Sequence, residues 1–124
     1  MIQEKQALPG IDRIQTRFLD MLKDRQADIA THALGAWESD TVEAINESLT
    51  EARNILRQIA GTAGSTSFDD LGATARDCAS KINTHLTGPD ADLALCPGEL
   101  VLYMDQFVQS CGALIEQHPQ LVRV

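Results

Sequence analysis

Apolar residues recur along this 124-residue chain with the period of a helix rather than that of a strand. The first such pattern extends from Pro9 to Leu34, with apolar side chains at intervals of three, four or seven. Its apolar positions are Ile11, Ile14, Phe18, Leu22, Ile29 and Ala33. This spacing places them on one face of a helix. We expect Gly35 and the Trp-Glu-Ser-Asp stretch that follows to end this helix.

A second helix is predicted to begin at Asp40, an N-cap residue type with a glutamate, Glu43, three positions later. The apolar stripe of this helix comprises Val42, Ile45, Leu49, Ala52, Leu56, Ile59 and Ala63. The Gly-Ser-Thr-Ser stretch at positions 64–67 predicts a turn after it.

The third predicted helix begins with Ser67 and Asp70 as a second capping pair and ends at Gly88-Pro89, where proline cannot continue it. Its apolar face consists of Phe68, Leu71, Ala75, Cys78, Ile82 and Leu86. The fourth has Pro97 in its first turn and ends before Pro119. The apolar positions of the fourth are Leu100, Tyr103, Met104, Phe107, Cys111, Leu114 and Ile115.

Each predicted helix is apolar on one side only, so each needs the others to bury that side. Short links between long helices favour antiparallel neighbours. We therefore predict one all-α domain over residues 1–124, an antiparallel up-down four-helix bundle, with a possible short lead-in helix over residues 1–8.

Composition narrows the class of protein. The net charge of −8 and the isoelectric point near 4.6 disfavour nucleic acid and membrane surfaces as partners, because both are polyanionic. We find no signal-peptide core and no apolar run of about 18 residues that could span a membrane, so we expect a cytoplasmic protein. The odd number of widely spaced cysteines favours reduced thiols, with Cys78 and Cys111 as small core residues.

The C-terminal half of the second helix carries an unusual surface. Beside its apolar stripe lie the basic or small residues Arg53, Arg57, Ala60, Gly61 and Gly64. A glycine inside a helix is less favourable than alanine by roughly 0.5–1 kcal/mol, so Gly61 needs a reason. Either a partner approaches there, or Gly61 lets the third helix pack closely. Gly64 can serve as a C-cap.

The antiparallel model gives this surface a neighbour. If the second and third helices turn near Ser65, Arg57 lies level with about Arg76, and Arg53 with about Lys81. These four residues would form a locally basic patch on an acidic chain. A solvated helix face of mixed charge is the alternative interpretation.

The segment from Arg57 to Leu71, Arg-Gln-Ile-Ala-Gly-Thr-Ala-Gly-Ser-Thr-Ser-Phe-Asp-Asp-Leu, resembles the central motif of histidine phosphotransfer (HPt) domains. The family pattern is similar to His-Arg-Leu-Ala-Gly-Thr-Ala-Gly-x-x-Gly-Phe-x-x-Leu. The resemblance implies a four-helix bundle that docks a response-regulator receiver domain or a sensor kinase in a phosphorelay.

Two positions depart from that pattern: Arg57 stands at the phospho-accepting histidine and Ser67 at a glycine of the turn. A guanidinium stays protonated and offers no nucleophilic lone pair, so Arg57 cannot accept a phosphoryl group as histidine does. His32, His85 and His118 fall outside the motif and are expected to be ordinary surface or boundary residues.

The resemblance therefore predicts a protein that docks a receiver or kinase domain without itself carrying phosphate. The expected partner-binding residues are Arg53, Arg57, Ala60, Gly61, Gly64 and Arg76. We expect no enzymatic activity, no cofactor and no metal, because the sequence lacks the common catalytic motifs and clustered His/Cys ligands. We also expect a monomer. The alternative function is a helical adaptor whose protein-binding role is unrelated to phosphotransfer.

Overall fold

The computed structural model describes residues 9–118, and every regular element in that range is helical. The main helices are α1 (Pro9–Glu38), α2 (Val42–Ala63), α3 (Asp69–Leu86) and α4 (Gly98–Gln117). Two short 3₁₀ turns, η2 (Gly64–Thr66) and η3 (Pro89–Asp92), follow α2 and α3. The prediction of an all-α fold with four helices is confirmed. The possible lead-in helix falls on residues outside the described range.

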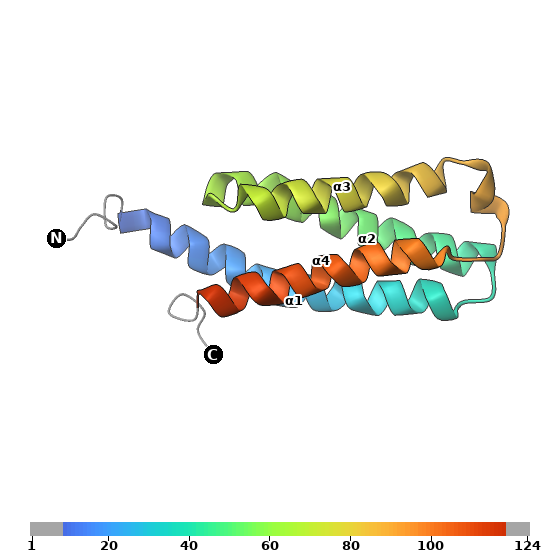
Figure 1. The fold of residues 1–124 in the computed structure, drawn as a ribbon, viewed down its shortest axis with the longest axis horizontal. Helices are drawn as coiled ribbons and strands as arrows, with labels where there is room; N and C mark the ends of the chain where they lie inside the picture. Colours follow the sequence, from blue (N-terminus) through green and yellow to red (C-terminus); the bar gives the residue numbers. More distant parts are fainter. Residues whose placement is uncertain (1–8, 119–124) are drawn as a thin grey trace.

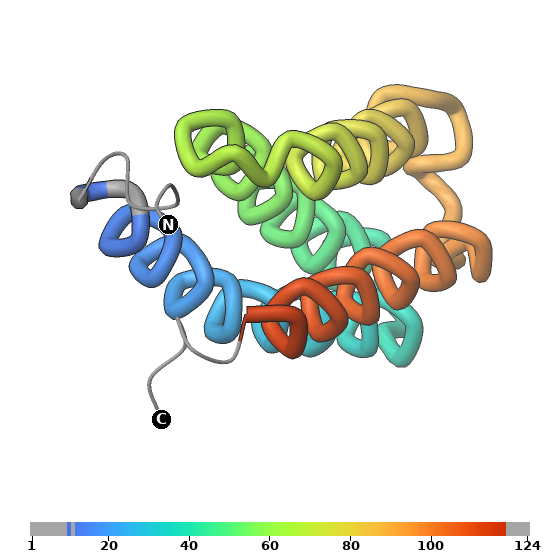
Figure 2. The backbone as a smooth tube through the Cα atoms, turned by 60° about the vertical axis from the view of Figure 1, so that its left-hand side comes forward, coloured from blue at the N-terminus to red at the C-terminus, as the bar shows by residue number. Residues whose placement is uncertain are grey.

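Consecutive helices run in opposite directions along the length of the molecule (Figure 1). Each long helix contacts two others: α2 lies against α1 and α3, and α4 lies against α1 and α3 (Figure 2). The α2–α3 pairing is the most extensive and the α3–α4 pairing the least. The tight turn between α2 and α3 therefore places the C-terminal half of α2 beside the N-terminal half of α3.

Most residues of the predicted apolar stripes form the core. In α2 every predicted stripe residue after Val42 is buried, and Val42 is half-buried. The buried apolar residues of α3 and α4 include Leu71, Ala75, Cys78, Ile82, Leu100, Met104, Phe107 and Cys111. Few of these side chains are aromatic, so the helices pack through Leu, Ile, Ala and Cys at close range.

The three cysteines are free and buried, as predicted for Cys78 and Cys111. Burial, together with the smaller effect of the Asp77 charge, raises the pKa of the Cys78 thiol to about 11. Burial likewise raises the pKa of Cys111 to about 12, and it also raises the pKa of Cys96. A thiol removed from water resists ionisation, because the thiolate would lose its hydration.

The first helix begins at Pro9, as predicted, but ends later than predicted. It continues through Gly35 to Glu38 rather than ending at Leu34. A Cβ atom added at Gly35 would lie 3.2 Å from the Ser48 Oγ, so this glycine allows α1 to approach α2 instead of ending the helix. Ile14, expected on the apolar face, is 46% exposed because it lies beyond the main core.

The helix starts also differ from the predicted capping residues. Thr41, not Asp40, caps α2, and its Oγ1 accepts a hydrogen bond from the Ala44 N–H at 3.2 Å. Pro97 is the N-cap of α4 and not part of its first turn. Ser67 makes no cap for α3: its backbone has φ 71° and ψ 14°, and the N-cap is Phe68. Ser67 thus occupies the left-handed conformation that glycine adopts most easily.

Candidate functional site: a basic groove between α2 and α3

A groove of about 410 Å³ lies between α2 and α3. Arg57, Ala60 and Gly61 line it from α2. The residues that line it from α3 are Arg76, Ala79, Ser80 and Asn83. Arg57 and Arg76, which were expected at about the same level along the bundle, both line this one groove. We refer to these seven residues as the basic groove.

Helical periodicity explains how the basic groove forms. The lining positions of α2 are separated by three and four residues, and those of α3 repeat in the same way, so each set lies on one face of its helix. Small residues follow the arginine in both sets, Ala60 and Gly61 on α2 and Ala79 and Ser80 on α3, which leaves a hollow between the two helices. Ala79, Ser80 and Asn83 were missed at the sequence level, although extending the antiparallel register from Arg76 would have found them.

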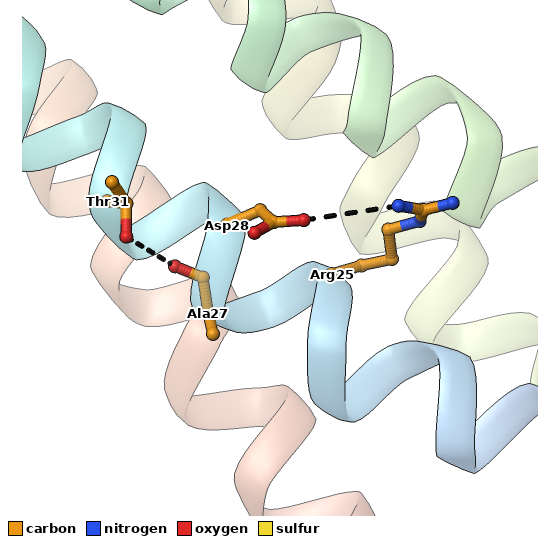
Figure 3. A network of polar contacts seen from close by, with 4 residues as sticks. All are labelled: Arg25, Ala27, Asp28 and Thr31. Carbon is orange, nitrogen blue, oxygen red and sulfur yellow. Dashed lines mark hydrogen bonds and ion pairs between the residues drawn. The ribbon is translucent and has the colours of Figure 1, made fainter.

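The charge of the basic groove is unbalanced. No carboxylate lines it, and Arg57 and Arg76 are exposed and form no ion pair with any residue in the range 9–118. By contrast, Arg25 on α1 lies 3.9 Å from the Asp28 carboxylate (Figure 3). Two uncompensated guanidinium groups therefore border one hollow on a chain whose net charge is −8.

Arg53 lies next to the basic groove but is already bound within the chain. Its Nη1 donates a hydrogen bond to the Asn83 Oδ1 at 2.9 Å, which connects α2 to α3. Its Nε and Nη2 donate to the Asn54 Oδ1 at 3.4 and 3.2 Å. A half-buried arginine with these partners fixes the position of Asn83, a role the sequence did not reveal.

The fourth expected member of the basic patch is placed elsewhere. Lys81 was expected level with Arg53, but its Nζ lies 4.7 Å from the centre of the Tyr103 ring. The Lys81 side chain therefore turns towards α4, where it makes a cation–π contact, and away from the basic groove. The predicted level of Lys81 agrees with the contact between Arg53 and Asn83, but Lys81 does not join the basic patch, because its angular position around α3 directs it to α4.

The two glycines near the groove have different surroundings. A Cβ atom added at Gly61 would meet nothing within 4 Å, whereas one added at Gly72 would lie 3.0 Å from the Ala63 Cβ and 3.6 Å from the Ala60 carbonyl oxygen. Close helix packing therefore explains Gly72 and does not explain Gly61. Gly64 is the C-cap of α2, with φ −62°, and an added Cβ there would also meet open space. Gly64 is exposed and does not line the groove.

The chemistry available in the basic groove is that of non-covalent binding. Its charged groups are guanidiniums, which donate hydrogen bonds and do not act as nucleophiles or bases at neutral pH. Ser80 supplies a hydroxyl, but no histidine or carboxylate lines the groove to activate it. Across residues 9–118 no cluster of three potential metal ligands is found, and no helix is long and apolar enough to cross a membrane.

The groove therefore fits an oxyanion or an acidic partner surface better than it fits a reacting substrate. Charge-assisted hydrogen bonds from guanidinium groups are the interactions it can offer. Comparisons of the chain with protein-family models, with curated proteins and with solved structures find no match.

Proposed function

We propose that this protein is an HPt-like signalling component: an antiparallel up-down bundle that docks a response-regulator receiver or a sensor kinase domain without carrying phosphate. The observation that carries the proposal is the basic groove. Arg57, at the position of the phospho-accepting histidine in the resembled motif, lines this hollow together with Gly61 of the same helix and Arg76 of α3, and no carboxylate lines it.

The surroundings of Gly61 support an external contact. A helical glycine destabilises its helix by roughly 0.5–1 kcal/mol relative to alanine, and no neighbour within the described chain requires it. A docked protein whose backbone approaches α2 at this position would supply the missing reason. Small residues on either side, Ala60 and Ala79, leave room for the same approach.

The charge of the basic groove favours an acidic partner. A guanidinium can pair with carboxylates in two parallel hydrogen bonds, which gives both affinity and orientation. Arg57 would enter the acidic pocket of a receiver in the place of an imidazole. Because it cannot accept a phosphoryl group, the complex would sequester the receiver from transfer.

The test is a binding and transfer experiment with purified receiver and kinase domains of the source organism. We expect at least one of them to bind, measured by calorimetry, and we expect no stable transfer of labelled phosphate to the protein. Arg57→Glu should abolish binding, while Arg13→Glu, an equal charge change at an exposed site on α1, should preserve it. Stable labelled phosphate on the protein would contradict the claim that it cannot accept a phosphoryl group. If none of the receiver and kinase domains bound, the docking claim would be contradicted.

A second candidate function, a helical adaptor unrelated to phosphotransfer, is favoured by one separate observation. Leu34 and Trp37 are 55% and 56% exposed beside a groove between α1 and α4. Exposed apolar patches often mark protein interaction sites. Arg57→Glu separates the two functions, because an adaptor that binds through α1 and α4 would keep its partner, whereas Trp37→Ser would weaken that binding.

A further inference from the structure

The hydrogen-bond donors of the basic groove favour one class of ligand. Its side chains offer two guanidinium groups, the Ser80 hydroxyl and the Asn83 amide. The Asn83 Oδ1 already accepts from Arg53, so the Asn83 Nδ2 is left as a donor. The site therefore presents several donors and no charged acceptor, which is the complement of a multiply charged oxyanion.

We propose that the basic groove recognises a phosphoryl group presented by the docked partner, so that the protein binds the phosphorylated form in preference to the unmodified one. This inference rests on the proposed function, and it adds that the preferred partner is the phosphorylated one. The protein would then detect phosphorylation without taking part in the transfer.

Charge and the number of acceptor oxygens favour a phosphoryl group over a single carboxylate. A phosphoryl group carries a charge of about −1.5 to −2 at neutral pH and three acceptor oxygens, whereas a carboxylate carries −1 and two oxygens. Arg57 and Arg76 border the hollow from opposite helices and could contact different oxygens of one tetrahedral group. A single carboxylate would leave one of these two cations uncompensated.

The two arginines lie on an acidic chain, which limits how an anion can be held in the basic groove. The net charge of −8 repels anions at a distance, so an anion held here must gain its binding energy from short-range contacts. The small residues Ala60, Gly61 and Ala79 allow a tetrahedral group to approach both helices. The bond between Arg53 and Asn83 keeps one further donor in place at the edge of the groove.

The experiment compares receivers in two states. Each receiver that binds is measured unmodified and loaded with beryllofluoride, a stable mimic of the phosphorylated carboxylate. We expect at least tenfold tighter binding of the loaded form. Arg57→Ala and Arg76→Ala should each bring the ratio of the two affinities close to one, while Arg13→Ala should leave it unchanged. Circular dichroism of each variant establishes that the helices are intact.

A second measurement needs no receiver. Titration of the isotopically labelled protein with inorganic phosphate, against sodium chloride at matched ionic strength, should shift the amide signals of Ala60 and Gly61 in the wild type and not in Arg76→Ala. Equal affinity for both receiver states would overturn the inference and leave the proposed function standing. Absence of binding to either state would overturn both. Absence of phosphate-dependent shifts in the groove would also overturn the inference, even where a receiver binds.

Discussion

Gly72 on α3 lies directly against Ala63 on α2, so close that a Cβ atom added at Gly72 would be 3.0 Å from the Ala63 Cβ. Both residues are buried, and the Ala60 carbonyl oxygen lies 3.6 Å from the same point. The contact is between two helices whose backbones cannot separate without opening the core. The close α2–α3 pairing, which positions the basic groove, depends on this glycine.

Gly72→Val should therefore destabilise the protein. Extra methyl groups forced into a well-packed core cost about 1–3 kcal/mol, and the branched side chain has no free volume to enter at this position. The measurement is the free energy of unfolding from urea denaturation, followed by circular dichroism. An unchanged midpoint would show that α2 and α3 can separate freely, contrary to the packing described here.

Gly61→Ala should have the opposite effect on stability. The added methyl group meets no atom within 4 Å, and alanine is the better helix former by about 0.5–1 kcal/mol, so the free energy of unfolding should rise by that amount. Partner binding should weaken at the same time if a docked backbone approaches this position. The same urea denaturation assay applies, and lower stability of Gly61→Ala would mean that the glycine is needed within the chain.

Ser67→Gly should stabilise the turn between α2 and α3. Ser67 has φ 71° and is the only non-glycine residue with positive φ among the described residues. A left-handed conformation costs an L-residue roughly 1–2 kcal/mol, which glycine avoids, although glycine also loses more chain entropy on folding. We expect a net gain of about 0.5–1 kcal/mol, measured as a higher thermal midpoint.

Ser65→Gly is the matched control for that change. Ser65 lies in the same turn with ordinary φ, and its Oγ donates a hydrogen bond to the Thr62 carbonyl at 2.9 Å. The substitution removes this bond and raises the conformational entropy of the unfolded chain. It should therefore destabilise the protein by a few tenths of a kcal/mol to about 1 kcal/mol. If both glycine substitutions shifted the midpoint in the same direction, the backbone conformation of Ser67 would not be the cause.

Stability should fall in alkaline solution because of the buried thiols. Burial raises the pKa of Cys78 to about 11 and that of Cys111 to about 12, whereas an unfolded thiol ionises near pH 8.5. Above that pH the unfolded chain loses thiol protons that the folded chain keeps. Unfolding is therefore favoured as pH rises, by about 1.4 kcal/mol per pH unit for each thiol between the two pKa values.

The check is the pH dependence of the free energy of unfolding, with Cys111→Ala as the comparison. The variant starts from a lower stability because it loses core contacts, but its slope between pH 9 and 11 should be shallower, since only one strongly shifted thiol remains. Parallel slopes for the two proteins would exclude Cys111 as a source of the alkaline instability.

The sequence predicted much of this fold because burial follows local periodicity. The α2 stripe from Ile45 to Ala63 is buried as expected, since one helix face must be removed from water whatever its neighbours are. The end of α1 was missed because Gly35 reads locally as a helix terminator. Its actual reason, the Ser48 side chain of α2, is a long-range contact that no local pattern contains.

The site was predictable to the same degree and for the same reason. Arg57, Gly61 and Arg76 could be brought together by counting residues through an antiparallel turn. Lys81 could not be placed, because its direction depends on the angular position around α3 and on Tyr103 of the next helix. The contact between Arg53 and Asn83 was likewise invisible, since side-chain partners across helices depend on the crossing geometry.

The last prediction separates the structural arginine from the exposed one. Arg53 is half-buried and connects α2 to α3 through the Asn83 side chain, whereas Arg57 is exposed and makes no ion pair with a described residue. A hydrogen bond that involves a charged group contributes roughly 1.5–3 kcal/mol, less where water competes, so Arg53→Ala should lower the free energy of unfolding by about 1 kcal/mol. Arg57→Ala should change it by no more than about 0.5 kcal/mol, as exposed substitutions do.

Urea denaturation of both variants, with Asn83→Ala and the double variant Arg53→Ala/Asn83→Ala, gives the coupling energy between the two bonded side chains. Zero coupling would contradict the bond, and a loss of stability in Arg57→Ala equal to that in Arg53→Ala would mean that Arg57 is held within the bundle and is not available to a partner.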